Sequence, residues 1–596
     1  MSLRRAHAWV LFVAVAAYVN SVANGFAYDD NSVVTHNPVV TDARWGEALL
    51  GPYWADAQEG GKLWRPVTIT SFTAEWRLWG GDPLGYHAVN VLLHALVSAL
   101  VLALLARFMA VPAALVGAVF FAIHPVHVEA VANVVGRSEL YAAAAVLGAC
   151  LVYLDRGGGG PWRRGLRLGA VSFLYLVGLG AKEIAVTLPG VLLLLEVCRQ
   201  DARTLRERLR RDVPVFVSLA AVLVAYLVLR ASVLETFTGE VPAAALRGLG
   251  TGERILTALT VWPQYLRLMV FPRTLSADYA PGVMMVAHSV TPGVILGGLV
   301  ILVWVGSAVA AFRSAPAVSA GLGWFVVATL PVSNLLFPVG ILLAERTLYL
   351  PSVGAALVVG WAVEAVRRTA SVPALRAAAV AAGVGAVALF LRTVDRNPTW
   401  MSTYVVLNTL AAEHPESFLA LRSRASGLVR VGEVEQASRY FDLAVRLAPY
   451  HYGLLAEVAD FYARQRGDGR AEELVRQAIA VSPENPAAYR TLASMHLRQG
   501  RGREAHRAAL EGLARAGPDR ELWSIVSESY IAKGDLEAAA RARQAALGQD
   551  AGSVHDWERL AQILRALGRE EDAAAAGERA RALGLEPRDA GLNPSA

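Results

Sequence analysis

Four short clusters of ionisable residues lie next to long apolar segments, and they hold most of the residues that could do chemistry. The first cluster contains Asp29 and Asp30, which come directly after the first apolar segment. Neighbouring carboxylates can supply a general base or ligate a divalent cation. An isolated acidic pair more often caps a helix or lies in a polar loop, so the pair alone does not choose between these roles.

The second cluster combines imidazole and carboxylate groups. His124, His127 and Glu129 lie within six residues, and Pro125 stands between the two histidines. Two His and a Glu could bind a metal ion. Their i, i+3, i+5 spacing does not put all three on one helical face, so hydrogen bonding to a polar substrate is favoured over metal ligation. The cluster continues with Asn133, Arg137, Ser138 and Glu139.

The two remaining clusters supply cations. Lys182 is one of three lysines in the chain, and it could pair with the adjacent Glu183 or contact a lipid phosphate. Arg346 lies between Glu345 and Tyr349, and a planar guanidinium suits bidentate contact with phosphate. Acids, phosphate-binding cations and aromatic residues therefore converge at the ends of apolar segments.

The composition indicates a membrane protein. Hydrophobic residues make up 55% of the 596 residues and charged residues only 18%, with a mean hydropathy of +0.40. A globular surface needs about 25% charged residues, so much of this surface is expected to face lipid. The net charge of +6 is concentrated in short loops between apolar segments, which favours a topology signal over a nucleic-acid site. The two cysteines lie in or at the end of apolar segments and imply no disulfide framework.

Eleven apolar segments approach the roughly 20 residues that cross the hydrocarbon core. The first is expected to be a retained helix and not a cleaved signal peptide. Residues 254–272 are amphipathic and contain Pro263, which favours an interfacial or re-entrant helix over a span. The predicted spans are 8–22, 88–108, 112–131, 138–154, 166–181, 184–198, 213–232, 291–312, 318–337, 348–366 and 375–393.

Arginine-rich loops predict the orientation. With the N-terminus in the cytoplasm, the loops that contain Arg163–Arg167, Arg203–Arg211 and Arg367–Arg376 all fall inside, as the positive-inside rule requires. The four clusters then share the outer side. An odd number of spans also puts everything after residue 394 outside.

The C-terminal part has a 34-residue period. Ala437, Ala471, Ala505, Ala539 and Ala573 recur at this spacing, and Gly432, Gly500, Gly534 and Gly568 precede four of them by five residues. Small residues allow paired helices to cross closely, and Gly ends the first helix of each pair. This pattern predicts a tetratricopeptide (TPR) α-solenoid of about five repeats over 397–586, after a membrane domain over 1–396 and before a tail at 587–596. The predicted fold class is all-α throughout.

The position of the charges favours chemistry on a lipid-carried substrate. A transporter would place charges or broken helices near mid-span, whereas here the spans stay apolar and the charges lie at one rim. No nucleotide-binding or hydrolase motif is visible in the sequence. A non-enzymatic scaffold that binds partner proteins through its repeats is the alternative.

These motifs resemble the transmembrane and TPR-containing O-mannosyltransferases, within the GT-C class of glycosyltransferases. The resemblance covers nearly the whole chain, because the repeats follow the membrane domain in the same order. The motifs are Tyr28-Asp29-Asp30, Trp64-Arg65-Pro66, Gly85-Tyr86-His87 with Asn90, His124 to Glu129, Gly136-Arg137 with Glu139, Ala181-Lys182-Glu183, and Glu345-Arg346 with Tyr349 and Ser352.

The resemblance implies transfer of a hexose, with mannose as a candidate, from a polyprenyl-phosphate donor to Ser or Thr hydroxyls of a protein acceptor. Asp30 or Asp29 would be the general base, and Arg346, Lys182 and Arg137 would bind the donor phosphate. The substrate-binding set would be His87, His124, His127, Glu129, Glu139, Glu183, Glu345 and Tyr349.

The same resemblance implies that the TPR array presents the acceptor, that membrane lipid surrounds the first domain, and that nucleic acid is not a partner. No cofactor is certain, and a divalent cation is possible. The Arg- and Ala-rich composition favours a bacterial inner membrane with a periplasmic repeat domain, or an endoplasmic reticulum membrane with a luminal one if the source is eukaryotic.

Overall fold

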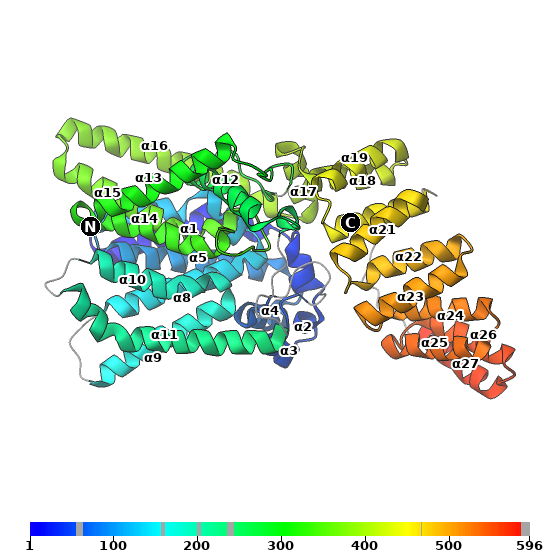
Figure 1. Cartoon of the computed structure of the whole chain (residues 1–596). Helices are drawn as coiled ribbons and strands as arrows, with labels where there is room; N and C mark the ends of the chain where they lie inside the picture. Colours follow the sequence, from blue (N-terminus) through cyan, green and yellow to red (C-terminus); the bar gives the residue numbers. More distant parts are fainter. Residues whose placement is uncertain are drawn as a thin grey trace. The chain divides into compact units, whose positions relative to one another are not determined.

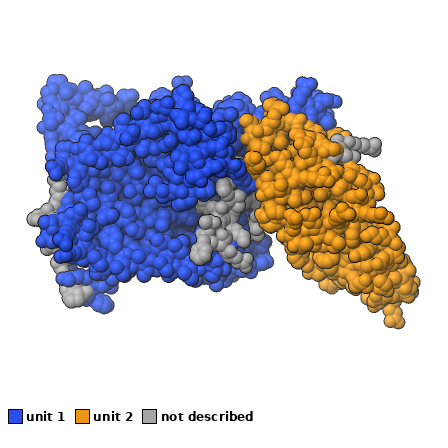
Figure 2. Space-filling view, in the orientation of Figure 1, with its two compact units in different colours: residues 1–440 blue, residues 441–596 orange. Residues whose placement is uncertain are grey.

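The computed structural model describes residues 1–54, 63–155, 161–199, 204–234, 243–279, 281–465 and 468–585. Every regular element among these residues is helical. Internal packing divides the chain into two compact units, residues 1–440 and 441–596 (Figure 2). The predicted boundary after residue 396 stays a prediction, and the two helices that follow it pack within the first unit. The predicted tail at 587–596 and Arg203 lie outside the described residues.

Long apolar helices dominate the first unit (Figure 1). Six segments of the described chain are long and apolar enough to cross a membrane, so the protein is an integral membrane protein. A seventh candidate is formed by α6 (Val111–Ala122) and the following Pro125–Val131, which meet at a 48° bend. The six contain α1 (Leu3–Tyr18), α5 (Pro83–Leu105), α8 (Arg137–Leu154), α11 (Leu205–Leu234), α13 (Pro292–Ser314) and α16 (Val372–Arg396).

Four other predicted spans form helices outside this set of six. Helix α10 has 11 residues and α14 has 14, while α9 carries three arginines and α15 carries two with a glutamate. The amphipathic helix α12 (Thr251–Val270) is also outside the set of six. The bounds are Pro161–Ala181 for α9, Leu188–Cys198 for α10, Pro316–Thr329 for α14 and Ser352–Thr369 for α15.

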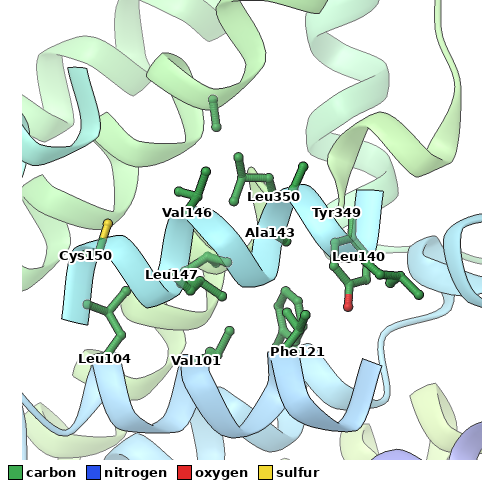
Figure 3. Packing of buried hydrophobic residues seen from close by; sticks show 14 of the residues in the cluster. Val101, Leu104, Phe121, Leu140, Ala143, Val146, Leu147, Cys150, Tyr349 and Leu350 are labelled. Carbon is green, nitrogen blue, oxygen red and sulfur yellow. The ribbon is translucent and has the colours of Figure 1, made fainter. Parts of the chain in front are cut away.

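Small residues let the helices of the first unit approach closely. In the core around α8, Ala143 and Leu147 belong to the same buried cluster as Val101 of α5 and Phe121 of α6, and Figure 3 shows Leu147 on the side of α8 that faces Val101. A Cβ atom on Gly117 of α6 would lie 2.5 Å from the carbonyl oxygen of Ala356 of α15. Glycine is therefore required where these two helices cross, as is common in membrane helix packing.

Short turns connect the long helices, and many of the predicted site residues lie in or next to them, whereas His87 lies in α5 and Arg137 and Glu139 lie in α8. The long helices are interrupted at these turns, which contain prolines and polar residues. These turns are η2 (Asn31–Thr35), η3 (Pro125–His127), η4 (Val134–Gly136), η5 (Glu183–Thr187) and η8 (Glu345–Leu348), with α4 (Pro66–Trp79) and α7 (Val128–Val131) beside them.

The repeat region consists of helix pairs with the predicted period. All five phased alanines have no exposed surface, and the four phased glycines have φ between +71° and +83°. A positive φ is the conformation that ends a helix at glycine, so the TPR-like assignment is confirmed. The paired helices are α18 (Phe418–Arg430) and α19 (Val434–Leu447), α20 (Tyr452–Arg464) and α21 (Asp468–Val481), α22 (Pro486–Arg498) and α23 (Gly502–Ala516), α24 (Arg520–Ala532) and α25 (Leu536–Gln549), and α26 (Val554–Ala566) and α27 (Glu570–Leu585).

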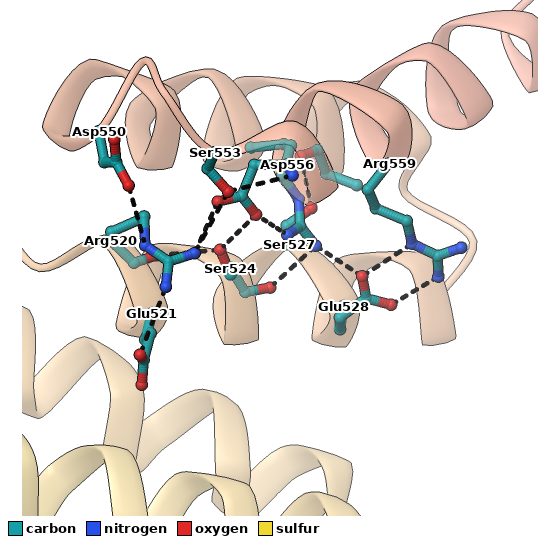
Figure 4. Close-up of polar contacts among 11 residues, drawn as sticks. Arg520, Glu521, Ser524, Ser527, Glu528, Asp550, Ser553, Asp556 and Arg559 are labelled. Atoms are coloured by element: carbon teal, nitrogen blue, oxygen red, sulfur yellow. Dashed lines mark hydrogen bonds and ion pairs between the residues drawn. The ribbon is translucent and has the colours of Figure 1, made fainter. Parts of the chain in front are cut away.

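A buried ion-pair network lies inside the second unit. Arg543 of α25 stands at the 34-residue phase where earlier repeats have Phe441 and Val475, and its side chain is 1% exposed. Its guanidinium pairs with Asp556 at 2.6 Å and with Glu528 at 2.5 Å. Asp556 also accepts a hydrogen bond from the Arg520 guanidinium at 2.9 Å, and Figure 4 shows Arg520, Asp556, Glu528 and Arg559 in the surrounding network.

Candidate active site

The Asp30 carboxylate anchors the loop that follows α1. It is fully buried and accepts hydrogen bonds from the backbone amides of Ala27 at 3.0 Å, Val135 at 2.9 Å and Val134 at 3.4 Å. Burial raises the pKa of Asp30 to about 7, although the three amides oppose that rise. Because its oxygens are committed to the backbone, Asp30 connects this loop to η4.

Asp29 is the accessible member of the acidic pair. Its residue is half-buried, and its charge interacts with the guanidinium of Arg346 and with the Tyr53 hydroxyl. The preceding Tyr28 has φ of +53°, a left-handed conformation that is uncommon outside glycine. Such backbone strain is often found at functional sites. The turn thus buries the Asp30 carboxyl against backbone amides and leaves Asp29 half-buried, with its charge acting on Arg346.

Arg346 is fixed in place by Glu129. The Glu129 carboxylate accepts hydrogen bonds from both the backbone amide of Arg346, at 2.8 Å, and its guanidinium. Glu129 is 2% exposed and the Arg346 side chain 26% exposed, so the buried acid holds a cation that solvent can still reach. Although burial lowers the pKa of Arg346, the charges of Glu129 and Asp29 raise it overall.

Two further cation–carboxylate pairs lie near this one. The ammonium of Lys182 pairs with the buried Glu139, and the guanidinium of Arg65 forms a bidentate pair with Glu183, at 2.8 Å for the shortest contact. Burial lowers the pKa of Lys182, and the Glu139 charge counters this. Burial raises the pKa of Glu183, but the Arg65 charge and hydrogen bonds lower it overall.

The three pairs form one electrostatic cluster. The charges of Arg65 and Arg346 both act on Lys182, and the charges of Asp29 and Glu139 act on Arg346. The charges of Asp29, Lys182 and Arg346 therefore influence one another although these residues come from three separate turns. We name the three cation–carboxylate pairs, without Asp29, the cation cluster: Arg65, Lys182 and Arg346 with Glu183, Glu139 and Glu129.

Arg65 was named in the sequence only as part of a motif, and its role as a third cation was missed. Its only signal in the sequence is its place in the Trp64-Arg65-Pro66 motif at the start of α4. The partner, Glu183, is 118 residues away in the sequence, so no local pattern connects the two.

Arg137 lies away from solvent. Its guanidinium is fully buried and donates to Glu75, to the Asn90 side chain at 2.8 Å and to the Tyr86 carbonyl at 2.8 Å. It also lies over the Phe72 ring, 4.8 Å from the centroid. This geometry fits a structural ion pair and leaves no exposed face for a phosphate. Sequence reasoning did not find Glu75, whose only signal is a lone acid on an apolar helix.

Glu345 contacts the loop between α12 and α13. Its buried carboxylate accepts hydrogen bonds from the Ser276 amide at 2.6 Å and the Tyr279 hydroxyl at 2.8 Å. Burial raises the pKa of Glu345 to about 7. Its contacts attach η8 to the 272–291 loop, so its position indicates support of the site more than contact with a substrate.

The predicted histidines and Tyr349 are buried and bonded within the protein. His87 Nε2 donates to the Gly25 carbonyl at 3.1 Å, and His124 Nε2 to the Met269 carbonyl at 3.2 Å. His127 Nε2 donates to Ser352 Oγ at 2.8 Å, and the Tyr349 hydroxyl donates to His94 Nδ1 at 2.8 Å. In the part of the chain that the structure describes, no group of three or more His, Cys, Asp or Glu is arranged to hold a metal ion.

Comparison with known proteins finds relatives whose sequences match most of this chain. No protein-family model matches the sequence. The chain is 27% identical over 555 residues to Protein O-mannosyl-transferase Tmtc3 of Drosophila melanogaster, covering 80% of this chain and 58% of the relative. It is 25% identical over 604 residues to TMTC3 of Mus musculus, covering 88% and 65%. A shorter match, 34% identical over 280 residues, relates it to Tmtc2 of Drosophila melanogaster, covering 45% and 29%.

The protein is thus a homologue of the protein O-mannosyl-transferases, as the motifs predicted, and it spans under two thirds of the length of these relatives. Among solved structures, the TPR protein YrrB, titled as having an unusual peptide-binding site, is 16% identical and covers 30% of this chain and 93% of its own, with a TM-score of 0.25. That score is too low to bear on the fold, which rests on the helix pairs described above.

Proposed function

We propose that this chain is a membrane glycosyltransferase that moves a hexose, with mannose as the first candidate, from a polyprenyl-phosphate donor to Ser or Thr hydroxyls of proteins. The observation that carries the proposal is the half-buried Asp29, whose charge acts on Arg346, in a homologue of the protein O-mannosyl-transferases. The transfer needs a base for the hydroxyl and a cation for the leaving phosphate. Asp29 and Arg346 are groups of these two kinds.

In the proposed reaction, Asp29 accepts the proton of the acceptor hydroxyl while that oxygen forms a bond to the anomeric carbon. The bond between the anomeric carbon and the phosphate oxygen breaks, and the polyprenyl phosphate leaves with the electron pair. Attack from the opposite face inverts the anomeric centre. Asp29 is preferred to Asp30 as the base, because the oxygens of Asp30 already accept three backbone hydrogen bonds.

The cation cluster is suited to the phosphate that gains charge in this step. Arg346 has the most exposed side chain of the three cations, and Glu129 fixes its position before any substrate binds. Preorganised charge of this kind contributes more to catalysis than charge that must move into place. Lys182 and Arg65 are proposed to add to the positive electrostatic potential at the same phosphate. Arg137 is proposed to have a structural role only.

The wider setting is proposed on the same grounds. The membrane unit is proposed to be GT-C-like with eleven spans, with α9, α10, α14 and α15 as the four beyond the seven described above. The active site would lie on the extracytoplasmic face, periplasmic in a bacterium, and the donor lipid would be undecaprenyl or dolichyl phosphate. The TPR array would bind the protein acceptor, as concave repeat surfaces bind extended peptides.

The test is direct transfer by the purified full-length chain in lipid nanodiscs. The protein is incubated with polyprenyl-phosphate mannose or glucose and a Ser/Thr-rich peptide, and mass spectrometry looks for a gain of one hexose on the peptide. Asp29→Asn is expected to abolish the gain, and the exposed Arg368→Ala on α15 is the matched surface control. Folded wild-type protein that transfers no hexose from either donor would contradict the proposal and favour the scaffold function.

A further inference from the structure

The first helices after the long membrane helices pack against the loop that carries Asp29. Helix α17 (Thr403–Glu413) and helix α18 both belong to the first compact unit. The Gly25 amide donates to the Met401 carbonyl at 3.0 Å, just before α17 begins. A backbone hydrogen bond thus attaches the start of the α17 segment to the loop that follows α1.

A second loop of the membrane unit contacts the same segment. The Phe418 amide, at the start of α18, donates to the Pro281 carbonyl at 3.1 Å. Gly282 has φ of +104°, and a Cβ atom there would lie 2.1 Å from the Glu416 carbonyl oxygen. Two backbones meet here with no room for a side chain.

The Thr403 hydroxyl receives hydrogen bonds from both sides of Asp29. The Tyr28 amide donates to Thr403 Oγ1 at 2.8 Å, and the Asn31 side-chain amide donates to the same oxygen at 3.1 Å. Tyr28 is the residue in the left-handed conformation. A strained turn persists only where its surroundings hold it, and this hydroxyl contacts the turn immediately before Asp29.

The hydroxyl of Thr403 is not needed to begin its own helix. The N-cap of α17 is Ser402, whose Oγ accepts from the Val405 amide at 3.3 Å. Helix α18 adds a charge to the same region, because Arg422 interacts electrostatically with the Tyr28 hydroxyl, as Arg346 does. Thr403 of α17 and Arg422 of α18 thus both interact with the Tyr28–Asp29 turn.

We propose that Thr403 is a positioning residue for Asp29, so that the first helices after the membrane helices set the geometry of the reaction site. The hydroxyl holds the Tyr28–Asn31 turn, and the turn aims the Asp29 carboxyl at Arg346. The catalytic part of this inference rests on the proposed function, whereas the structural part does not.

The first readout is amide hydrogen exchange of the full chain in nanodiscs, which needs no enzymatic activity. In Thr403→Val, exchange at residues 26–32 is expected to rise about fivefold, the effect of one lost hydrogen bond. Thr403→Ser keeps the hydroxyl and is expected to stay within twofold of wild type. Tyr404→Phe is the matched control, because it removes an exposed hydroxyl from the same helix and should leave exchange at residues 26–32 unchanged. Unchanged exchange there in Thr403→Val would overturn the proposal.

The second readout is the split between kcat and KM for hexose transfer. Thr403→Val is expected to lower kcat about tenfold with the donor KM within twofold, and Thr403→Ser to restore most of kcat. Faster exchange in Thr403→Val with undiminished kcat would overturn the positioning role. A wild-type chain without transfer would refute the proposed function instead, and the exchange data would still decide whether Thr403 holds the Asp29 turn.

Discussion

Glu129 holds Arg346 by two separate groups, the backbone amide at 2.8 Å and the guanidinium. The two residues are 217 positions apart in the sequence and come from α7 and η8. The double contact fixes the position of both the Arg346 backbone and its guanidinium. Removing Glu129 should therefore affect catalysis through Arg346 and not through a group that touches the sugar.

Glu129→Gln is expected to lower kcat/KM for the donor by about 100-fold, in the range measured when one stabilising donor is misplaced. Arg346→Lys keeps a charge but cannot form the same planar contacts, so it should lose activity to a similar degree. Donor titration in the transfer assay measures both. A Glu129→Gln chain with wild-type kcat/KM would show that the pair has only a structural role.

Asp29→Asn and Asp30→Asn should fail in different ways. The Asp29 variant is expected to keep its fold and lose transfer by 100-fold or more, because a general base contributes about 10²–10⁴-fold. The Asp30 variant should lose about 1–3 kcal/mol of local stability, since an amide group would meet backbone N–H donors. Amide exchange of residues 26–36 separates the two, and equal loosening in both variants would contradict the assignment.

The Asp30 loop should become less stable as the pH rises from about 4 to about 7. Burial raises the pKa of Asp30 to about 7 in the folded chain, above the unfolded value near 4. The folded state then binds a proton that the unfolded state has lost, so stability is complete below pH 4 and falls towards pH 7. Glu345, with its pKa also raised to about 7, acts in the same direction.

Amide exchange at residues 26–36, corrected for the intrinsic effect of pH, measures this dependence. Asp30→Asn is expected to flatten it at this loop, whereas Glu345→Gln should flatten it at the 272–291 loop. A wild-type loop whose protection increases over this pH range would show that Asp30 stays ionised.

Gly282→Ala should loosen the contact between the 272–291 loop and the start of α18. The added methyl would overlap the Glu416 carbonyl, and φ of +104° is strained for any residue with a side chain. A loss of about 1–3 kcal/mol is expected, seen as faster exchange on both sides of the contact. Gly298→Ala on α13, where a Cβ atom meets nothing within 4 Å, is the matched control and should change little.

Arg543→Ala should destabilise the last repeats far more than Arg520→Ala. Both arginines pair with Asp556, at 2.6 Å and 2.9 Å, but the side chain of Arg543 is 1% exposed and that of Arg520 is 32% exposed. Breaking a buried pair costs about 3–5 kcal/mol, and a more exposed pair contributes about 1 kcal/mol or less. Limited proteolysis of the full chain within α24–α26 measures the difference. Equal susceptibility of the two variants would contradict it.

The helices and repeats followed from the sequence because they depend on local patterns. The alanines and glycines at 34-residue spacing act only on neighbouring helices. In the structure the five alanines are buried and the four glycines have a positive φ, as expected. The count of spans was less secure, because helices such as α10 are short and lie against others in the first unit. Length and apolar character alone do not distinguish a short span from a buried helix.

The clusters of candidate residues were visible in the sequence, but their pairing was not. Lys182 was expected to pair with Glu183 or a phosphate, and it pairs with Glu139, whereas Glu183 pairs with Arg65. Adjacent residues point in different directions at a turn, so sequence neighbours are poor guides to partners. The same reason separates Asp29 from Asp30, which share a motif and have different surroundings.

Each cation of the cation cluster has its own glutamate, so its formal charges cancel before Asp29 is added. Such a site has a weak long-range electrostatic potential. A negatively charged headgroup would therefore diffuse to it within the bilayer and bind through short-range contacts. Donor association should therefore respond weakly to ionic strength. The spent lipid, bearing one more negative charge than it had as a glycoside, would meet no surplus of positive charge to retain it, which favours rapid turnover.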